Sequence, residues 1–219
     1  MDNKLKVLKE RQEDIFVSLA SLLGAMASPV RIRLIHFLSQ APLTVDVIAS
    51  KVDESIANTS MHLRKMLNER LVSVETLGQK RLYALSPAVL EFWEHYQDLA
   101  QKLDPTLKLE THDIYGDLNW TNTLDETKKL LRSGDVVLLD VRPLDEGIGE
   151  DDSGMVLHIP QTELKSSLKK ISKKKKILVF CRGRLCALSA FSVNYLREKG
   201  YKAYRLDVSW NVVKGVIYG

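Results

Sequence analysis

The chain has 219 residues, of which 45% are hydrophobic and 27% are charged, and its formal net charge is only +4. This composition is that of a globular protein, and the length suits one large domain or two domains of about 100 residues each. No apolar run reaches the roughly 18 residues of a membrane-spanning helix, and the charged N-terminus lacks the apolar core of a signal peptide. We therefore expect a cytoplasmic protein without membrane contact.

The first hundred residues show helical spacing of apolar residues and then strand-like alternation. Four helices are predicted before residue 70, and their expected starts are residue 4, Pro29, Thr44 and Ile56. Ser28 and Ser55 stand where side-chain caps are expected. Alternating apolar residues on either side of Gly78 predict a β-hairpin, and Pro87 begins a further helix that runs to about Leu103.

Residues 104–119 contain Pro, Gly and polar residues without a clear period, so we place a linker there, between a domain at 1–103 and a domain at 120–219. In the second domain, short apolar runs predict strands at 136–141, 176–180 and 201–206, and a helix is predicted at 187–199. Strands separated by helical segments indicate βαβ units and a parallel sheet. The predicted fold class is a mainly α winged helix-turn-helix domain followed by an α/β domain.

The order of helix, helix, turn, helix and hairpin is that of a winged helix-turn-helix domain. The fourth helix and the hairpin tip carry side chains of the types that read base edges or bind phosphates. The candidate DNA-binding residues are Asn58, Thr59, Ser60, His62, Arg64, Lys65, Lys80 and Arg81. Arg31 and Arg33 are further candidates for phosphate contacts. Residues 1–100 contain 12 basic and 12 acidic residues, so any DNA-binding signal lies in the positions of the charges.

Three segments of this half, LGAMASPVRIRLIHFL, VIASKVDESIANTSMHLRKMLNERLV and GQKRLYALS, resemble the ArsR-type winged-helix repressors over residues 15–100. The resemblance implies a recognition helix at 55–69, a wing at 71–85, and a homodimer formed by the first and last helices. Such a dimer binds double-stranded DNA at two half-sites about 34 Å apart. Metal sensors of the family use cysteine pairs or Asp, His and Glu sets. Because this half contains no cysteine and no matched ligand clusters, we expect no metal site and no cofactor.

The only two cysteines, Cys181 and Cys186, lie in the run KILVF-CRGRLC-ALSAF. Cys181 follows a predicted strand and precedes a helix, which is where open α/β folds bind ligands and where a helix N-terminus favours negative charge. Two arginines add positive potential, and a glycine permits unusual backbone angles. The candidate catalytic residues are therefore Cys181, Arg182, Gly183, Arg184, Leu185 and Cys186. This setting predicts a thiolate with a lowered pKa.

The segment CRGRLCALSAF resembles the active-site loop of rhodanese domains, especially those fused to ArsR-type repressors, and the resemblance covers residues 120–219. LLDVRP resembles the strand-end motif of that family, with Asp140 and Arg142 in structural positions, and YKAYRLDVSW places Trp210 near the usual tryptophan. The resemblance implies that Cys181 accepts a sulfane sulfur from a donor such as thiosulfate or polysulfide and passes it on through a covalent intermediate. The phosphatase relatives of the fold need an arginine six residues after the cysteine, and that position is Ala187.

Two questions stay open from the sequence. Cys186 either attacks a modified Cys181 to form a bridge or is a buried residue at a helix start without a redox role. The chain is either a sulfur-responsive DNA-binding regulator, which we expect to be a repressor, or a sulfurtransferase whose winged helix serves for dimerisation or localisation. A third hypothesis is a constitutive DNA-binding protein with an inert rhodanese-like module.

Overall fold

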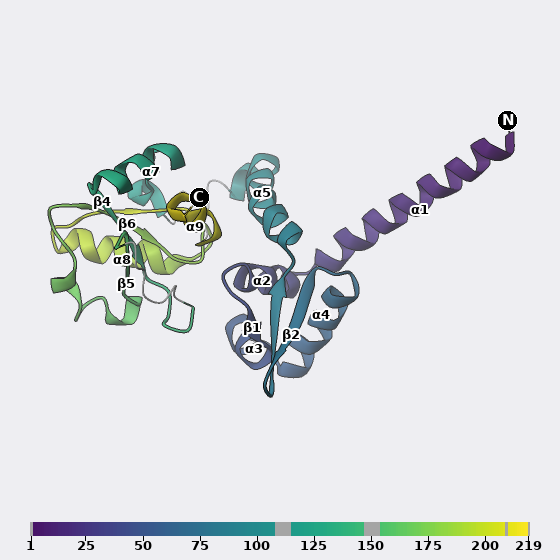
Figure 1. Cartoon of the computed structure of the whole chain (residues 1–219), viewed down its shortest axis with the longest axis horizontal. Helices are drawn as coiled ribbons and strands as arrows, with labels where there is room; N and C mark the ends of the chain where they lie inside the picture. Colours follow the sequence, from purple (N-terminus) through teal and green to yellow (C-terminus); the bar gives the residue numbers. More distant parts are fainter. Residues whose placement is uncertain (1, 108–114, 147–153, 209, 219) are drawn as a thin grey trace. The chain divides into compact units, whose positions relative to one another are not determined.

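A computed structural model describes residues 2–107, 115–146, 154–208 and 210–218. The chain divides into two compact units, Met1–Tyr96 and Gln97–Gly219 (Figure 1). Each unit has its own hydrophobic core. We describe each unit by itself.

The first unit contains the predicted helices and hairpin, and helix α5 continues past its boundary. Its elements are α1 (Asp2–Met26), α2 (Pro29–Leu38), β1 (Leu43–Thr44), α3 (Val45–Val52), α4 (Ile56–Asn68), β2 (Val72–Leu77), β3 (Lys80–Leu85) and α5 (Pro87–Leu103). The predicted hairpin is confirmed, since β2 and β3 pair antiparallel with Leu77 opposite Lys80 across the turn. The two-residue strand β1, which pairs with β3, was not predicted because it is too short to show alternation.

The core of this unit is formed by α2, α3, α4, the hairpin and the first part of α5. Leu34, Ile48, Leu63 and Met66 are fully buried there, and Trp93 closes the core from α5. The cap predicted at Ser55 is confirmed, because its hydroxyl accepts a hydrogen bond of 3.1 Å from the backbone N–H of Asn58.

The cap predicted at Ser28 is wrong for the side chain. Ser28 occupies the N-cap position of α2, but its hydroxyl makes no cap hydrogen bond. Its backbone carbonyl accepts the N–H of Ile32 instead, and Pro29, which has no N–H to satisfy, begins the helix.

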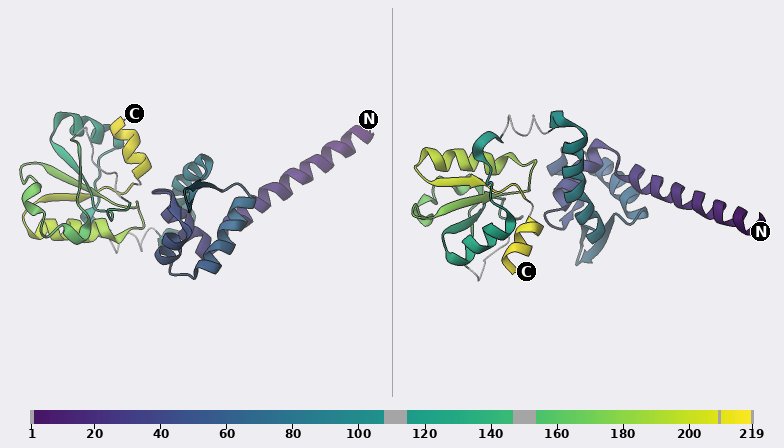
Figure 2. Two further views of the ribbon diagram at one scale, coloured as in Figure 1. Left: turned by 60° about the horizontal axis from the view of Figure 1, so that its bottom comes forward. Right: turned by 90° about the horizontal axis from the view of Figure 1, so that it is seen from above.

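Helix α1 runs away from the rest of the first unit as one long helix (Figure 2). Its large apolar residues from Leu5 to Leu23 are between 38% and 62% exposed, and they include Leu5, Leu8, Ile15, Leu19, Leu22 and Leu23. An apolar stripe of this length therefore remains outside the core of the single chain. No single helix of the described residues is long and apolar enough to cross a membrane. Segment Leu5–Met26 and α2 reach that length and composition only as a pair bent by 80°.

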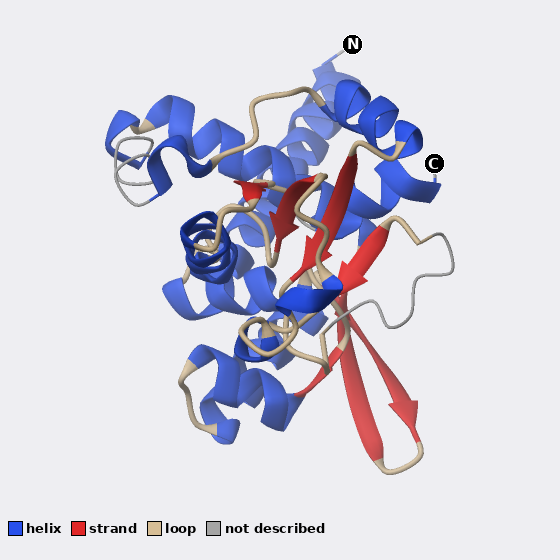
Figure 3. Ribbon diagram, turned by 90° about the vertical axis from the view of Figure 1, so that its left-hand side faces the viewer, coloured by secondary structure: helices blue, strands red, loops and turns tan. Residues whose placement is uncertain are grey.

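The second unit is built on a four-stranded sheet, drawn in red in Figure 3. Its elements are η1 (Gly116–Leu118), α7 (Leu124–Ser133), β4 (Val136–Asp140), β5 (Val156–His158), η2 (Gln161–Glu163), η3 (Leu168–Lys170), β6 (Lys176–Phe180), α8 (Ala187–Glu198), β7 (Lys202–Arg205) and α9 (Trp210–Tyr218). The strand order is β5-β4-β6-β7, and all three pairings are parallel, which confirms the predicted parallel sheet.

Alternation along strand β6 divides the core of the second unit into two layers. Ile177 and Val179 face the cluster that contains α8, whereas Leu178 and Phe180 face the cluster that contains α7 and α9. Cys181 continues the first series and belongs to the α8 cluster. Cys181 therefore lies at the carboxyl end of β6, one of the two inner strands of the sheet, between β6 and α8.

Part of the predicted linker 104–119 packs into the core of the second unit. Tyr115 and Leu118 are buried in the α8 cluster, and the backbone N–H of Trp120 donates to the carbonyl of Arg205 at 2.7 Å. The packed part of the second unit therefore extends upstream at least to Tyr115. Residues 108–114 of the predicted linker lie outside the described residues.

Candidate functional site

The loop between β6 and α8, residues 181–186, carries both cysteines, and we call it the cysteine loop. It contains a tight turn closed by a backbone hydrogen bond. Gly183 has a φ of +87°, a left-handed angle that glycine adopts without strain, and its carbonyl accepts the N–H of Cys186 at 3.2 Å. Cys186 is the N-cap residue of α8, and the Leu185 side chain is exposed. This turn brings the two cysteines, five residues apart, into one buried cluster.

The two cysteines are free and buried, and they contact one another. Cys181 Sγ lies 3.6 Å from the carbonyl oxygen of Cys186 and 3.4 Å from Ser189 Oγ. Burial raises the pKa of Cys181, so the sequence-based expectation of a thiolate at that position is wrong for this closed loop. The side-chain interaction with Cys181 outweighs burial and lowers the pKa of Cys186 to about 6. We therefore expect the first thiolate of this loop on Cys186.

Arg182 is paired with a carboxylate that the sequence did not single out. Its Nε and Nη2 donate to the two oxygens of Glu146 at 2.6 and 2.7 Å, and Glu146 is 4% exposed. Burial alone lowers the pKa of Arg182, but the bonds to Glu146 outweigh it and raise that pKa. Because this ion pair is neutral overall, Arg182 adds much less positive potential beside Cys181 than the sequence predicted.

Asp140 and Arg142 form a fully buried ion pair at the end of β4. Arg142 donates to the Asp140 carboxylate from its backbone N at 3.0 Å, from Nε at 3.0 and 3.2 Å, and from Nη2 at 2.7 Å. Its guanidinium carbon lies 5.7 Å from the ring centroid of Phe180 and 5.5 Å from that of Trp210. These contacts tie β4 to the end of β6 and to α9, which supports the structural position that the resemblance implied for this pair.

Arg205, at the end of β7, is the functional candidate that sequence reasoning missed. Its side chain is 1% exposed and donates to the carbonyl oxygen of Arg184 at 2.6 Å and to that of Gly183 at 3.3 Å. The alternation of the strand could have identified it. Arg205 lies on the same face of the strand as Tyr201 and Ala203, which are both buried. A charged residue in a buried register position needs a structural or chemical reason.

In the first unit, the exposed residues of the proposed DNA-binding face are Arg64 and Lys65 on α4, and Lys80 and Arg81 on the hairpin. Asn58 and Ser60 are partly exposed, and the Asn58 amide donates to Glu54 at 2.8 Å. These positions suit contacts with bases and phosphates.

Three of the residues predicted to contact DNA have other roles in the structure. The Thr59 side chain is fully buried, and it faces the core because it lies four residues before Leu63 on the same side of the helix. Arg31 is 7% exposed and donates to the carbonyls of Gly24 and Ala27, which braces the junction of α1 and α2. Arg33 donates to Glu54 at 2.8 Å. Thr59 and Arg31 are therefore packing residues.

His62 is half-buried, and one ring nitrogen lies 3.2 Å from Arg31 Nη1. Burial, followed by the charge of Arg31, lowers the pKa of His62. Both causes favour the neutral imidazole over the cation.

Comparison with known proteins assigns a family to each half. Residues 26–75 match the helix-turn-helix domain family, and residues 123–215 match the rhodanese-like domain family. The HTH-type transcriptional regulator Rv0324 of Mycobacterium tuberculosis is 24% identical over 199 residues, which cover 90% of this chain and 88% of that protein. This chain is a helix-turn-helix transcriptional regulator with a rhodanese-like domain. The pairing predicted from the sequence is confirmed.

Solved structures similar to the regulator's first domain have low TM-scores. The homodimeric winged helix-turn-helix DNA-binding domain of a possible ArsR-family regulator from Mycobacterium bovis is 21% identical, covers 42% of this chain and 88% of that chain, and has a TM-score of 0.41. NolR from Sinorhizobium fredii is 27% identical, covers 41% of this chain and 90% of that chain, and has a TM-score of 0.39.

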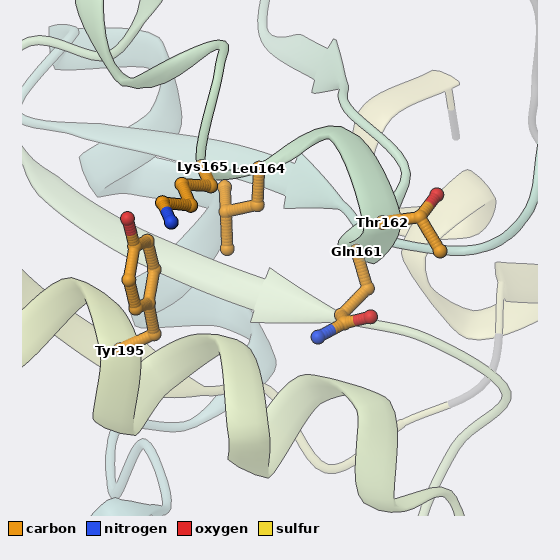
Figure 4. A pocket seen from close by; sticks show the side chains of 5 residues that line it. All are labelled: Gln161, Thr162, Leu164, Lys165 and Tyr195. Carbon is orange, nitrogen blue, oxygen red and sulfur yellow. The ribbon is translucent and has the colours of Figure 1, made fainter.

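The rhodanese-like domain also has a surface hollow of about 310 Å³. Figure 4 shows its lining side chains, Gln161, Thr162, Leu164 and Lys165 from the segment around η2 and Tyr195 from α8. None of these residues belongs to the cysteine loop, and Tyr195 lies more than two turns along α8 from Cys186. The hollow is therefore separate from the site around Cys181.

Proposed function

We propose that this regulator binds DNA through its winged-helix domain, as a repressor, and that its rhodanese-like domain senses sulfane sulfur on Cys181. The observation that carries the proposal is the placement of both cysteines in the buried loop of the rhodanese-like domain, while the helix-turn-helix domain contains none. Thiol chemistry in this chain is therefore confined to the domain whose family transfers sulfur.

The DNA-binding part of the proposal is supported by the exposed cations of α4 and the hairpin, Arg64, Lys65, Lys80 and Arg81. We expect a homodimer that binds two half-sites on double-stranded DNA. The apolar stripe of α1 supports dimerisation, because a single chain leaves it in water.

The sulfur step is a nucleophilic displacement. Cys181 loses its proton to solvent and attacks the sulfane sulfur of a polysulfide; a bond forms between the two sulfurs, and the donor sulfur–sulfur bond breaks with its electron pair on the departing sulfur. The Cys186 thiolate then attacks Cys181 Sγ. The bond between Sγ and the outer sulfur breaks, and the outer sulfur leaves with the electron pair and takes a proton from solvent to become hydrosulfide. The net change oxidises the two thiols to a disulfide and reduces one sulfane sulfur to sulfide.

The test is to treat the reduced, full-length protein with polysulfide and to measure peptide masses and promoter binding on the same sample. Trypsin cleaves after Arg182 and Arg184, so Cys181 and Cys186 fall in different peptides and a disulfide appears as their cross-linked mass. We expect sulfur on Cys181, or the cross-link, together with at least a tenfold loss of affinity for its own promoter DNA, about 1.4 kcal/mol, at fixed salt.

The Cys181→Ser variant is expected to bind DNA without responding to polysulfide, and Cys186→Ser is expected to stop at the persulfide. If Cys181→Ser left both the affinity and its response unchanged, the sensor proposal would be wrong. Sulfur uptake without a change in DNA affinity would favour the second candidate function, a sulfurtransferase, which the match to the rhodanese-like family supports. That candidate is tested by sulfur transfer to cyanide or to a thiol.

A further inference from the structure

The hydroxyl of Ser189 and the guanidinium of Arg205 both contact the cysteine loop. Ser189 Oγ is 3.4 Å from Cys181 Sγ, and Arg205 Nε donates a hydrogen bond of 3.2 Å to the same Oγ. We propose that Ser189 stabilises negative charge on Cys181, as thiolate or persulfide, and that Arg205 is the positioning residue that turns the Ser189 hydroxyl toward that sulfur. The inference rests on the proposed function only in taking Cys181 as the atom that accepts sulfur.

The surroundings of Arg205 hold its guanidinium in one orientation. Its guanidinium carbon lies 3.9 Å from the ring centroid of Tyr115, and Nη1 donates to Asn119 at 3.0 Å. The same Nη1 lies 3.0 Å from the carboxylate of Asp207, which balances the buried charge. Because a guanidinium is planar and its donors are fixed relative to one another, these contacts also define the direction of the Nε–H.

The remaining donor of Arg205 holds the loop backbone. Nη2 contacts the carbonyl oxygens of Gly183 and Arg184, at 3.3 and 2.6 Å. One buried cation therefore joins the cysteine loop to the first turn of α8, where Ser189 lies. A change at Arg205 alters the loop and the Ser189 hydroxyl together, whereas a change at Ser189 alters only the hydroxyl.

The direction of the Ser189 hydroxyl follows from its single proton. Arg205 Nε occupies an acceptor lone pair of Oγ, so the hydroxyl is left to donate. Two acceptors are within reach, the carbonyl of Cys186 at 3.4 Å and Cys181 Sγ at 3.4 Å. When Cys181 carries a proton, its S–H lies 3.6 Å from the Cys186 carbonyl and the hydroxyl has no anion to bind. When the sulfur becomes negative, the hydroxyl donates to it, since a charged acceptor makes the stronger bond.

Removing the Ser189 hydroxyl tests the proposal without disturbing Arg205. We would titrate thiolate ultraviolet absorbance in full-length chains that carry Cys186→Ala, so that Cys181 is the sole thiol, and subtract a chain without cysteines to remove the tyrosine signal. Ser189→Ala is expected to raise the titration midpoint by about one pH unit, a tenfold fall in the acid constant. The rate of polysulfide uptake by Cys181 at neutral pH is expected to fall in proportion.

A matched control lies one turn further along α8. Ser192 is also fully buried, but its hydroxyl donates to the carbonyl of Leu188 within α8, at 2.8 Å. Ser192→Ala therefore deletes the same atom from the same helix. The titration midpoint of Cys181 in this variant is expected to equal that of the Cys186→Ala chain with both serines intact. Equal midpoints for Ser189→Ala and Ser192→Ala would overturn the inference.

Arg205→Gln is expected to raise the midpoint, and Arg205→Lys is expected to recover part of the shift because it keeps the charge. The other ionisable groups near Cys181 are Arg182 with Glu146, Asp207 and Tyr115, and none of them is substituted in any variant of the series. If Arg205→Gln does not fold, the comparison of the two serines decides. Sulfur uptake by the unmodified chain is a separate measurement. Its failure rejects the proposed function, and the titration shift still reports on Ser189.

Discussion

The buried pair Asp140–Arg142 allows the structural role of the strand-end motif to be measured. Both side chains are 0% exposed. Asp140→Ala leaves the guanidinium buried among Phe180 and Trp210 without a counter-charge, and it also removes the acceptor of the Arg142 backbone N–H. Breaking a buried ion pair in this way costs about 3–5 kcal/mol. We expect a loss of that size in the free energy of unfolding of the rhodanese-like domain.

The assay is denaturant unfolding followed by tryptophan fluorescence. Trp210 stacks on Phe180 at a centroid distance of 5.8 Å and reports on the rhodanese-like domain, while Trp93 reports on the winged-helix domain. The matched control is Asp117→Ala, because Asp117 is 92% exposed and pairs with Arg197 at the surface. An exposed pair of that kind contributes at most about 1 kcal/mol.

Replacement of both Asp140 and Arg142 provides a further test of the same reasoning. The double variant Asp140→Leu with Arg142→Met keeps apolar volume and removes both buried charges. It is expected to lose less stability than Asp140→Ala, about 1–3 kcal/mol, because no charge is left behind and only the backbone N–H of residue 142 loses its acceptor. Equal losses for Asp140→Ala and Asp117→Ala would refute the reasoning, since they would mean that burial of the pair has no energetic consequence.

Three further predictions concern the winged-helix domain and the cysteine loop. Met66→Ala, at a fully buried side chain, is expected to lower the stability of the winged-helix domain by about 2–5 kcal/mol in the Trp93 transition, with the Trp210 transition unchanged. Arg64→Ala is expected to weaken promoter binding by about 1–3 kcal/mol, whereas Thr59→Val leaves the affinity unchanged because Thr59 is buried; an equal effect of both would contradict the assigned face. In the unmodified, reduced chain, thiolate absorbance is expected to show a first step near pH 6 as Cys186 loses its proton with rising pH. Cys181→Ala removes the side-chain interaction that lowers this pKa and moves that step upward toward about pH 8.5, and a first step already near 8.5 in the unmodified chain would speak against the closed loop.

Much of the architecture follows from local patterns in the sequence. Helical and alternating periods predicted α1 to α5, α8, the hairpin and three of the four parallel strands. Strand β5 and helix α7 were missed. The three residues of β5 are too few to show a period. Helix α7 begins with a capping box formed by Thr123 and Glu126, which is the sequence feature that could have predicted it.

The sequence by itself determined the two domains, the cysteine loop and its place after a buried strand, since these depend on residue order along a few adjacent elements. Only the tertiary structure decided the protonation of the loop and the partners of its arginine. Cys181 is buried under the start of α8, Glu146 comes to Arg182 from the segment after β4, and Arg205 comes to Ser189 from β7. Burial and long-range pairing set pKa values and hydrogen-bond directions. Both depend on which distant residues the parallel sheet brings together, and no local pattern of residues contains that information.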